Sequence, residues 1–408
     1  MMKKLYAGWT SISIVERIIG GLFIGIILGM LIPQATGISI LGTAFVGSLK
    51  AIAPLLVFLL VISSLCHSGK SHGGVIKTVI ILYMFSTVLA AIIAVITSFM
   101  FPVTLTLAES SSEFSAPGGI GDVIRSLVNN IVANPIESIV KANYVGVLTW
   151  AVLIGISLRH AGEATKNVLG DLASGLSDVV TWIINLAPFG ILGLVFDTVS
   201  NNGLYVFAEY GRLIALLVGT MLFIYFVTNP ILVYWCTHKN PYPLIFRCLK
   251  KSAITAFFTR SSAANIPVNM EACEEMGLDK DTYSVTIPLG ATINMDGAAI
   301  TITVMTLAAA NTLGIAVDIP SAIVLSILSA ISACGASGVA GGSLLLIPMA
   351  CSLFGIPNDI AMQVVGVGFI IGVIQDSVET ALNSSSDLIL SASAEFRQWR
   401  KDGREIKL

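Results

Sequence analysis

Charged side chains are scarce in this chain of 408 residues. Lys and Arg number 22 and Asp and Glu 24, together 11% of the sequence, whereas a soluble domain carries about 25%. Hydrophobic residues reach 55% and the mean hydropathy is +0.89. So few charges cannot cover the core of a soluble protein of this size. The composition excludes disordered and fibrous proteins and indicates a chain solvated mainly by lipid.

The sequence also lacks clusters of one charge, of cysteine or of histidine. The formal net charge is −2, and no group of Lys and Arg is large enough to attract a polyanion, so we expect no nucleic-acid partner. The six cysteines occur singly, without the pairing of a metal site or disulfide framework. The four histidines share no ligand spacing. We therefore expect no transition-metal site.

Six apolar runs have the length of a membrane-spanning helix. The first ends at Pro33 without a small-residue cleavage site, which favours a retained span over a signal peptide. The second and third exceed the usual length of about 20 residues and must tilt or protrude, and Pro135 interrupts the fourth. The runs cover 15–32, 40–66, 75–101, 131–158, 179–198 and 212–236.

Basic residues give the orientation, because cytoplasmic loops are enriched in Lys and Arg. The connections 33–37, 102–121 and 199–205 contain none. The opposite ends of the runs and the tail after Ala394 hold most of them, so both termini should be cytoplasmic. With no sorting sequence visible, we expect a multi-pass protein of the bacterial cytoplasmic (inner) membrane. The basic residues at the inner ends are Lys3, Lys4, Lys70, Lys77, Arg159, Lys166, Lys239, Arg247, Lys250 and Lys251.

Two later apolar stretches are broken by small residues. Residues 257–268 read FFTRSSAANIPV, and residues 332–348 read SACGASGVAGGSLLLIP. Irregular backbone is tolerated at membrane depth only where protein or a cavity satisfies its polar groups. We therefore predict two re-entrant helical hairpins, named here the first broken segment (244–275) and the second broken segment (319–355). They start on opposite sides of the membrane, which is an inverted repeat in an all-α polytopic membrane protein.

Polar residues recur on one face of the last predicted helix, at spacings i, i+3, i+4, i+7 and i+11. A charge at mid-membrane costs about 2.5 to 3.5 kcal/mol, so this stripe indicates function. The alternative for a single residue is structural pairing, such as Arg260 with one acid. The stripe consists of Asp376, Glu379, Thr380, Asn383 and Asp387.

Oxygen-bearing side chains of this kind suit a small hard cation, and sodium fits better than a soft metal. Asn294 and Asp296 add further oxygens, and Gly297 makes local unwinding plausible. Asp376 can oppose an ammonium group, while Ser261 and Ser262 can donate to a carboxylate together with Asn383. This describes a pocket for a zwitterion, with ordinary small-residue packing as the alternative for the two serines. Tyr83, Ser86 and Thr87 lie within one turn and are either further cation ligands or packing residues.

Four motifs carry a resemblance to a known family. They are TRSSAANIPV (259–268), PLGATINMDGAA (288–299), GASGVAGG (335–342) and DSVETALNSSSD (376–387). With them the chain resembles the dicarboxylate/amino acid:cation symporters, the glutamate transporter homologues, and is most similar to the branch that couples sodium to serine and threonine. The resemblance implies eight transmembrane helices plus two re-entrant hairpins, and a homotrimer.

The resemblance also implies a transport domain that moves like an elevator against a trimerisation scaffold. The scaffold is expected to comprise 1–74 and 121–205, and the transport domain 75–120 and 206–408. Within the latter, the seventh span is expected at 281–311 and the eighth at 360–392, beside the sixth span and the two broken segments.

Matching the motifs position by position implies roles for individual residues. Ser262, Thr380 and Asn383 correspond to substrate-binding residues, beside Ser261, and Asp376 corresponds to the ligand of the amino group. The stretch from Gly338 would close over the substrate. One sodium ion would be held by Gly290, Asn294, Asn383 and Asp387. A second would use the carbonyls of Thr292 and Met295 with the second broken segment. A third would use Tyr83, Ser86, Thr87, Asn294 and Asp296.

Two positions depart from the family members that transport acidic substrates, which have Arg at the position of Glu379 and Thr at that of Ala298. A glutamate there repels aspartate and accepts a bond from a hydroxyl. We therefore predict sodium-coupled uptake of L-serine and L-threonine across the bilayer, with no enzyme activity. The alternatives are a proton-coupled transporter of neutral amino acids, in which Glu379 titrates, a channel, and an intramembrane protease using Asp296 and Asp376.

Overall fold

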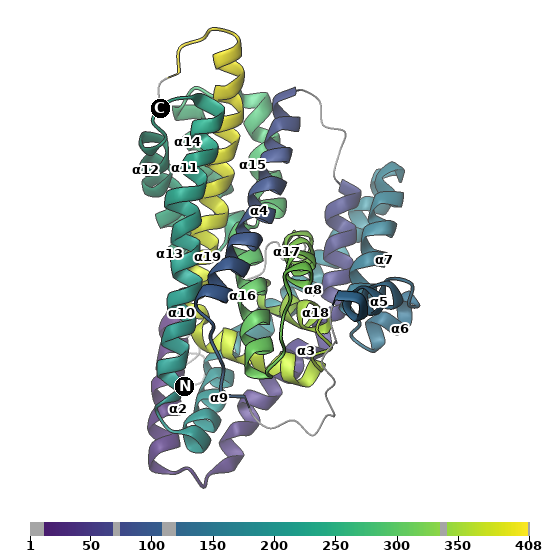
Figure 1. The fold of residues 1–408 in the computed structure, drawn as a ribbon, viewed down its shortest axis with the longest axis vertical. Helices are drawn as coiled ribbons and strands as arrows, with labels where there is room; N and C mark the ends of the chain where they lie inside the picture. Colours follow the sequence, from purple (N-terminus) through teal and green to yellow (C-terminus); the bar gives the residue numbers. More distant parts are fainter. Residues whose placement is uncertain (1–11, 68–73, 108–119, 335–340, 407–408) are drawn as a thin grey trace, which may run out of the picture.

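The computed structural model describes residues 12–67, 74–107, 120–334 and 341–406, and within these ranges the secondary structure is helical, without a strand. Long helices stand side by side in one bundle, with shorter helices beside it (Figure 1). Within these described ranges, five helical stretches are long and apolar enough to cross a membrane, and a bent pair would make a sixth. An all-helical membrane protein is what the composition predicted, since a backbone in hydrocarbon must bond to itself.

The first three long helices are α2 (Ile14–Leu31), α3 (Ser39–His67) and α4 (Gly74–Met100), and the shorter α9 (Ala187–Asn202) packs against α2 and α3. α2 begins with a capping box, in which Ser13 and Glu16 bond each other's backbone. α2 and α9 pack very closely, because glycines of α2 face the α9 backbone. A Cβ added to Gly25 would lie 2.7 Å from the carbonyl oxygen of Leu192.

The predicted fourth and fifth spans are both divided in the structure. The fourth is divided at Pro135, as expected, into α5 (Ile120–Ile131), α6 (Pro135–Val140) and α7 (Tyr144–Ser157). The fifth was placed wrongly at 179–198. There α8 (Glu163–Asn185) ends and α9 begins after a 52° bend, because Pro188 fits the first turn of a new helix and cannot continue the old one.

The second half begins with α10 (Val206–Phe223), a π-helical turn (η3, Ile224–Thr228) and α11 (Asn229–Thr237), which form one continuous stretch. The first broken segment begins within α12 (Tyr242–Cys248) and contains a π-helical turn (η4, Leu249–Ala253), α13 (Ile254–Thr259) and α14 (Ser262–Glu275). It is followed by α15 (Lys280–Ile293) and α16 (Asp296–Thr312). The second broken segment contains α17 (Ile319–Ala333) and α18 (Ile347–Ser352), and α19 (Asn358–Lys401) closes the chain.

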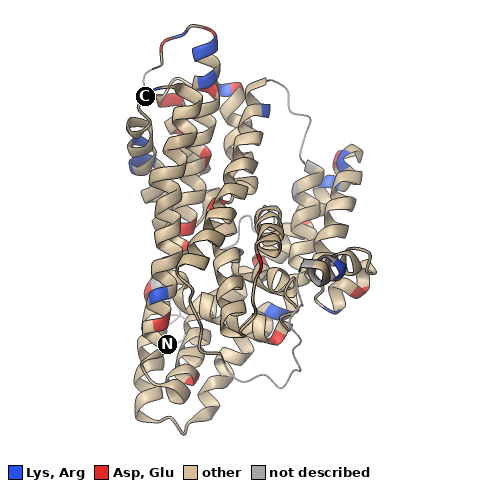
Figure 2. Cartoon of the chain, in the orientation of Figure 1, with Lys and Arg blue, Asp and Glu red and all other residues tan. Residues whose placement is uncertain are grey.

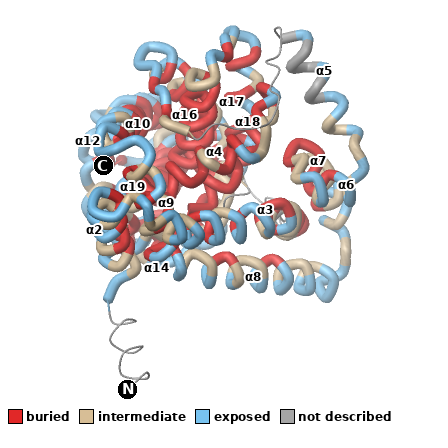
Figure 3. Tube along the Cα trace, turned by 90° about the horizontal axis from the view of Figure 1, so that it is seen from below, coloured by how far each residue is buried: buried red, intermediate tan, exposed pale blue. Residues whose placement is uncertain are grey.

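The core lies around α16 and α19. Every residue of α16 from Asp296 to Ala310 is buried. Figure 3 shows the buried residues gathered in the middle of the molecule, with α8 along one edge. Several Lys and Arg lie at the end of the bundle that holds the C terminus, while the middle is mostly uncharged (Figure 2). At that end Lys239 Nζ donates to the carbonyl oxygen of Ile406 at 2.8 Å. Polar groups inside this core therefore require an explanation.

Candidate substrate and cation site

The helical run from α15 to α16 is interrupted inside the core. Asn294 and Met295 have non-helical backbone angles, and α16 restarts at Asp296. Helix α4 packs against this break. Ser86 Oγ donates to Asp296 Oδ2 at 2.7 Å, and Thr87 Oγ1 lies 3.1 Å from Asp296 Oδ1. The break thus places a carboxylate and two hydroxyls together at a point where backbone carbonyls leave the helical ladder.

Tyr83 approaches this group through its main chain and not through its side chain. Its hydroxyl lies 2.7 Å from Ser391 Oγ and 3.1 Å from the carbonyl oxygens of Thr286 and Asp387. Its own carbonyl oxygen accepts from Thr87 Oγ1 at 3.0 Å. The carbonyl of Tyr83, not its hydroxyl, therefore lies beside the group formed by Ser86, Thr87 and Asp296.

A second group of oxygens surrounds the carboxylate of Asp387. Asn294 Nδ2 donates to Asp387 Oδ1 at 2.9 Å and lies 3.5 Å from the carbonyl oxygen of Asn383. Gly290 completes the group, since a Cβ there would lie 2.7 Å from Asp387 Oδ1. Asn294 Oδ1 is buried without a hydrogen-bond partner in the described part of the chain. Such an acceptor costs about 1–3 kcal/mol, which a bound cation would relieve.

The donor set distinguishes between kinds of cation. The described residues contain no group of three or more His, Cys, Asp or Glu that could hold a metal. Single carboxylates with amide, hydroxyl and carbonyl oxygens suit a weakly charged hard ion. Thr292 and Met295 border the same break, and Cys334 at the end of α17 lies 3.5 Å from the carbonyl oxygen of Ile293. The second broken segment therefore reaches the break as well.

A polar cavity of about 30 Å³ lies beside these oxygens. Its volume holds one or two water molecules, so in this conformation the cavity is too small for an amino acid. Ala298 is buried outside the lining, and Gly338 lies outside the described residues. The lining consists of Arg260, Ser261, Ser262, Met295, Gly342, Ser343, Asp376, Glu379, Thr380 and Asn383.

The first broken segment presents a basic residue and two serines to this cavity. Arg260 has a left-handed φ of 52°, and Ser261 is the extended N-cap of α14, accepting from the Ala264 amide. A non-glycine residue at positive φ is strained and marks a constrained site. Arg260 Nη2 lies 2.6 Å from Asp376 Oδ2, so the pairing of Arg260 with an acid, one of the alternatives from the sequence, is present. Asp376 Oδ1 accepts from the Gly341 amide at 3.3 Å.

Glu379 is held by three donors, none of which the sequence analysis singled out. Its Oε2 accepts from Thr301 Oγ1 at 2.7 Å, from Ser343 Oγ at 2.9 Å and from Gln375 Nε2 at 2.5 Å. The one available signal was Gln375, a polar residue one helical turn before Glu379 in an apolar run. Thr301 and Ser343 lie on other segments and carry no such signal.

Comparison with known proteins places this geometry in a family. Residues 14–395 match the sequence model of the sodium:dicarboxylate symporter family. The chain belongs to this family. It is 59% identical over 401 residues to the serine/threonine transporter SstT of Streptococcus thermophilus, covering 98% of this chain and all of that protein. It is 57% identical over 399 residues to the serine/threonine transporter SstT of Bifidobacterium adolescentis, and the match covers 98% of this chain and 93% of that protein.

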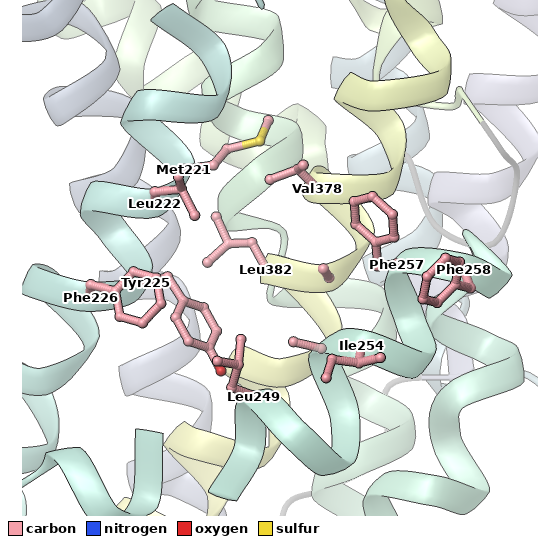
Figure 4. Close-up of a pocket in the computed structure, with 12 residues that line it drawn as sticks. Met221, Leu222, Tyr225, Phe226, Leu249, Ile254, Phe257, Phe258, Val378 and Leu382 are labelled. Carbon is pink, nitrogen blue, oxygen red and sulfur yellow. The ribbon is translucent and has the colours of Figure 1, made fainter. Parts of the chain in front are cut away.

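This member of the symporter family also has a larger cavity, of about 250 Å³, between α10, the first broken segment and α19 (Figure 4). Its one polar lining group, the Tyr225 hydroxyl, donates to the Ile245 carbonyl oxygen at 3.3 Å. A zwitterion finds no charged partner there, so the small polar cavity is the candidate substrate site. The lining of the larger cavity is Met221, Leu222, Tyr225, Phe226, Leu249, Ala253, Ile254, Phe257, Phe258, Val378, Ala381 and Leu382.

Proposed function

We propose that this chain takes up serine and threonine, driven by the sodium gradient. The observation that carries the proposal is the cavity in which Asp376, Glu379 and Asn383 meet the serines of the first broken segment, directly beside two groups of cation-binding oxygens. The names of the relatives supply the substrates, serine and threonine.

The cavity has a partner for each group of a hydroxyl amino acid. Ser261, Ser262, Thr380 and Asn383 would donate to the substrate carboxylate. The ammonium group would bind Asp376 through Oδ1, because Oδ2 is engaged by Arg260. Glu379 would accept from the side-chain hydroxyl and repel an acidic side chain. Ala298, buried under this region, leaves no second hydroxyl for an acidic substrate.

Sodium would bind at the three places described. Asp387, Asn294, Asn383 and the carbonyl of Gly290 form one set. The carbonyls of Thr292 and Met295 form a second with the second broken segment. The third set would consist of Ser86, Thr87, Asp296, Asn294 and the carbonyl of Tyr83. Ions here would orient Asn383, whose Oδ1 accepts from the Gly297 amide at 2.7 Å, and so favour substrate binding.

Transport requires that the loaded site reach both sides of the membrane. We propose the elevator arrangement, with 1–74 and 121–205 as scaffold and 75–120 and 206–408 as the moving domain. Each protein chain would have eight transmembrane helices, two re-entrant hairpins in an inverted repeat, and cytoplasmic termini. Three copies would assemble in the bacterial inner membrane. The second broken segment, with Gly338, would act as the gate.

Uptake of labelled serine into proteoliposomes tests this function. We expect accumulation with an inward sodium gradient, inhibition by excess threonine, and no inhibition by excess aspartate. Accumulation that needs no sodium and follows the pH gradient would replace sodium with the proton. Equal inhibition by aspartate and threonine would overturn the assignment of Glu379.

A further inference from the structure

Gln375, Thr301 and Glu379 form a hydrogen-bonded ring whose directions are fixed by chemistry. The Gln375 amide nitrogen can only donate, and it reaches both Thr301 Oγ1 at 2.8 Å and Glu379 Oε2. An ionised carboxylate can only accept. The single hydroxyl proton of Thr301 therefore points to Glu379 Oε2. Each member of the ring determines the orientation of the next.

The ring leaves one oxygen of Glu379 for the substrate. Three donors, including Ser343 Oγ, converge on Oε2, while Oε1 accepts no bond from any residue that the structure describes. Glu379 lines the polar cavity and is 6% exposed. The free oxygen is thus the acceptor available to a side-chain hydroxyl inside the pocket.

The ring also keeps the Glu379 carboxylate away from the Arg260 guanidinium. Arg260 lines the same cavity and is already bonded to Asp376. A carboxylate released from its donors could turn toward the guanidinium, because Arg offers five donors in a planar fork. Its acceptor would then be lost to the substrate hydroxyl.

The Gln375 side chain makes two bonds in the ring but also destabilises the fold, because its amide oxygen is unpaired. The residue is fully buried, and its Oε1 has no hydrogen-bond partner in the described part of the chain. An unpaired buried acceptor destabilises by about 1–3 kcal/mol. A leucine at this position would avoid that cost and lose the two bonds to the ring.

We propose that Thr301 and Gln375 are positioning residues that make the site selective for amino acids with a hydroxyl side chain over alanine. They act through Glu379, by holding Oε2 so that Oε1 faces the pocket. This inference rests on the proposed function and extends it to residues outside the cavity lining. A site built to bond a hydroxyl rejects the analogue that lacks it, because the acceptor is left unpaired.

The test compares two threonines of α16. Thr301→Val removes the ring hydroxyl without changing the shape of the side chain. Thr303→Val is the matched control, since Thr303 is fully buried in the same helix and its hydroxyl has no partner in the described structure. The measurement is the concentration of serine and of alanine that half-inhibits sodium-dependent uptake of labelled serine in proteoliposomes.

We expect Thr301→Val to reduce the serine-over-alanine preference at least tenfold, through a higher KM for serine, while alanine inhibition changes less than threefold. Gln375→Leu should do the same, Thr301→Ser should restore the preference, and Thr303→Val should keep it. An unchanged preference in Thr301→Val, or an equal loss in Thr303→Val, would overturn the proposal. Absence of sodium-dependent serine uptake by the unmodified protein would instead refute the proposed function.

Thermal unfolding of each variant in detergent separates positioning from folding. A variant that unfolds at the temperature of the unmodified protein and has lost the preference supports positioning. If every variant that loses the preference also unfolds early, and Thr301→Ser restores stability without the preference, the ring is only structural and the proposal is wrong.

Discussion

The substitution Asp387→Asn tests the cation site with little change of shape. The Asp387 carboxylate lies at the centre of one oxygen group and is 1% exposed. Asparagine has the same size but no charge. The Tyr83 hydroxyl lies 3.1 Å from the main-chain oxygen of residue 387, and this contact survives because it does not involve the side chain. The fold should therefore persist while the cation loses its counter-ion.

The expected loss of sodium affinity is estimated from the strength of a bond to a charged carboxylate. A hydrogen bond to a charged group contributes about 1.5–3 kcal/mol. If the cation loses a similar amount when the charge of Asp387 is removed, its affinity falls roughly 10- to 150-fold, because about 1.4 kcal/mol corresponds to a factor of ten. The sodium concentration for half-maximal serine uptake should rise accordingly.

The assay is serine uptake into proteoliposomes as a function of external sodium, with thermal unfolding as the measure of folding. Asp281→Asn is the control, since Asp281 is exposed in the first turn of α15 and should leave sodium activation unchanged. A folded Asp387→Asn protein with the sodium activation of the unmodified protein would refute the assignment of this site.

Three further substitutions have defined outcomes. Gly290→Ala places a Cβ 2.7 Å from Asp387 Oδ1 and should raise half-saturating sodium at least tenfold; unaltered sodium activation would contradict this. Glu379→Gln removes a negative charge from the pocket, so aspartate should inhibit serine uptake at least tenfold more strongly, and continued exclusion of aspartate would show that another group repels it. Gly25→Ala should destabilise the protein by about 1–3 kcal/mol by separating α2 from α9, seen as earlier thermal unfolding, whereas Gly20→Ala, with open space around it, should not.

The sequence predicted features that have a regular spacing or a large energetic penalty. The stripe on α19 follows from helical geometry, and its members Asp376, Glu379, Thr380 and Asn383 line one cavity. The break before Asp296 was indicated by a polar stretch and a glycine in an apolar run. A charge inside a membrane is expensive enough to be noticed from sequence alone.

Other features depend on contacts between distant segments and leave no local signal. The bond between Thr301 and Glu379 joins residues 78 positions apart, and a threonine in an apolar helix costs too little to stand out. The sequence did not show which acid pairs with Arg260, because the pairing with Asp376 depends on the left-handed backbone turn at the end of α13. The bend between α8 and α9 was missed because the apolar run continues through Pro188.

Coupled movement of sodium and serine is the central claim, and serine-driven sodium flux tests it most directly. Proteoliposomes hold equal sodium on both sides, an inward serine gradient is imposed, and uptake of isotopically labelled sodium is measured with the membrane potential clamped. Because coupling is reciprocal, we expect sodium to enter in proportion to serine, and the Asp387→Asn protein to need a higher sodium concentration for the same flux. Serine entry without any accompanying net sodium entry would contradict the account.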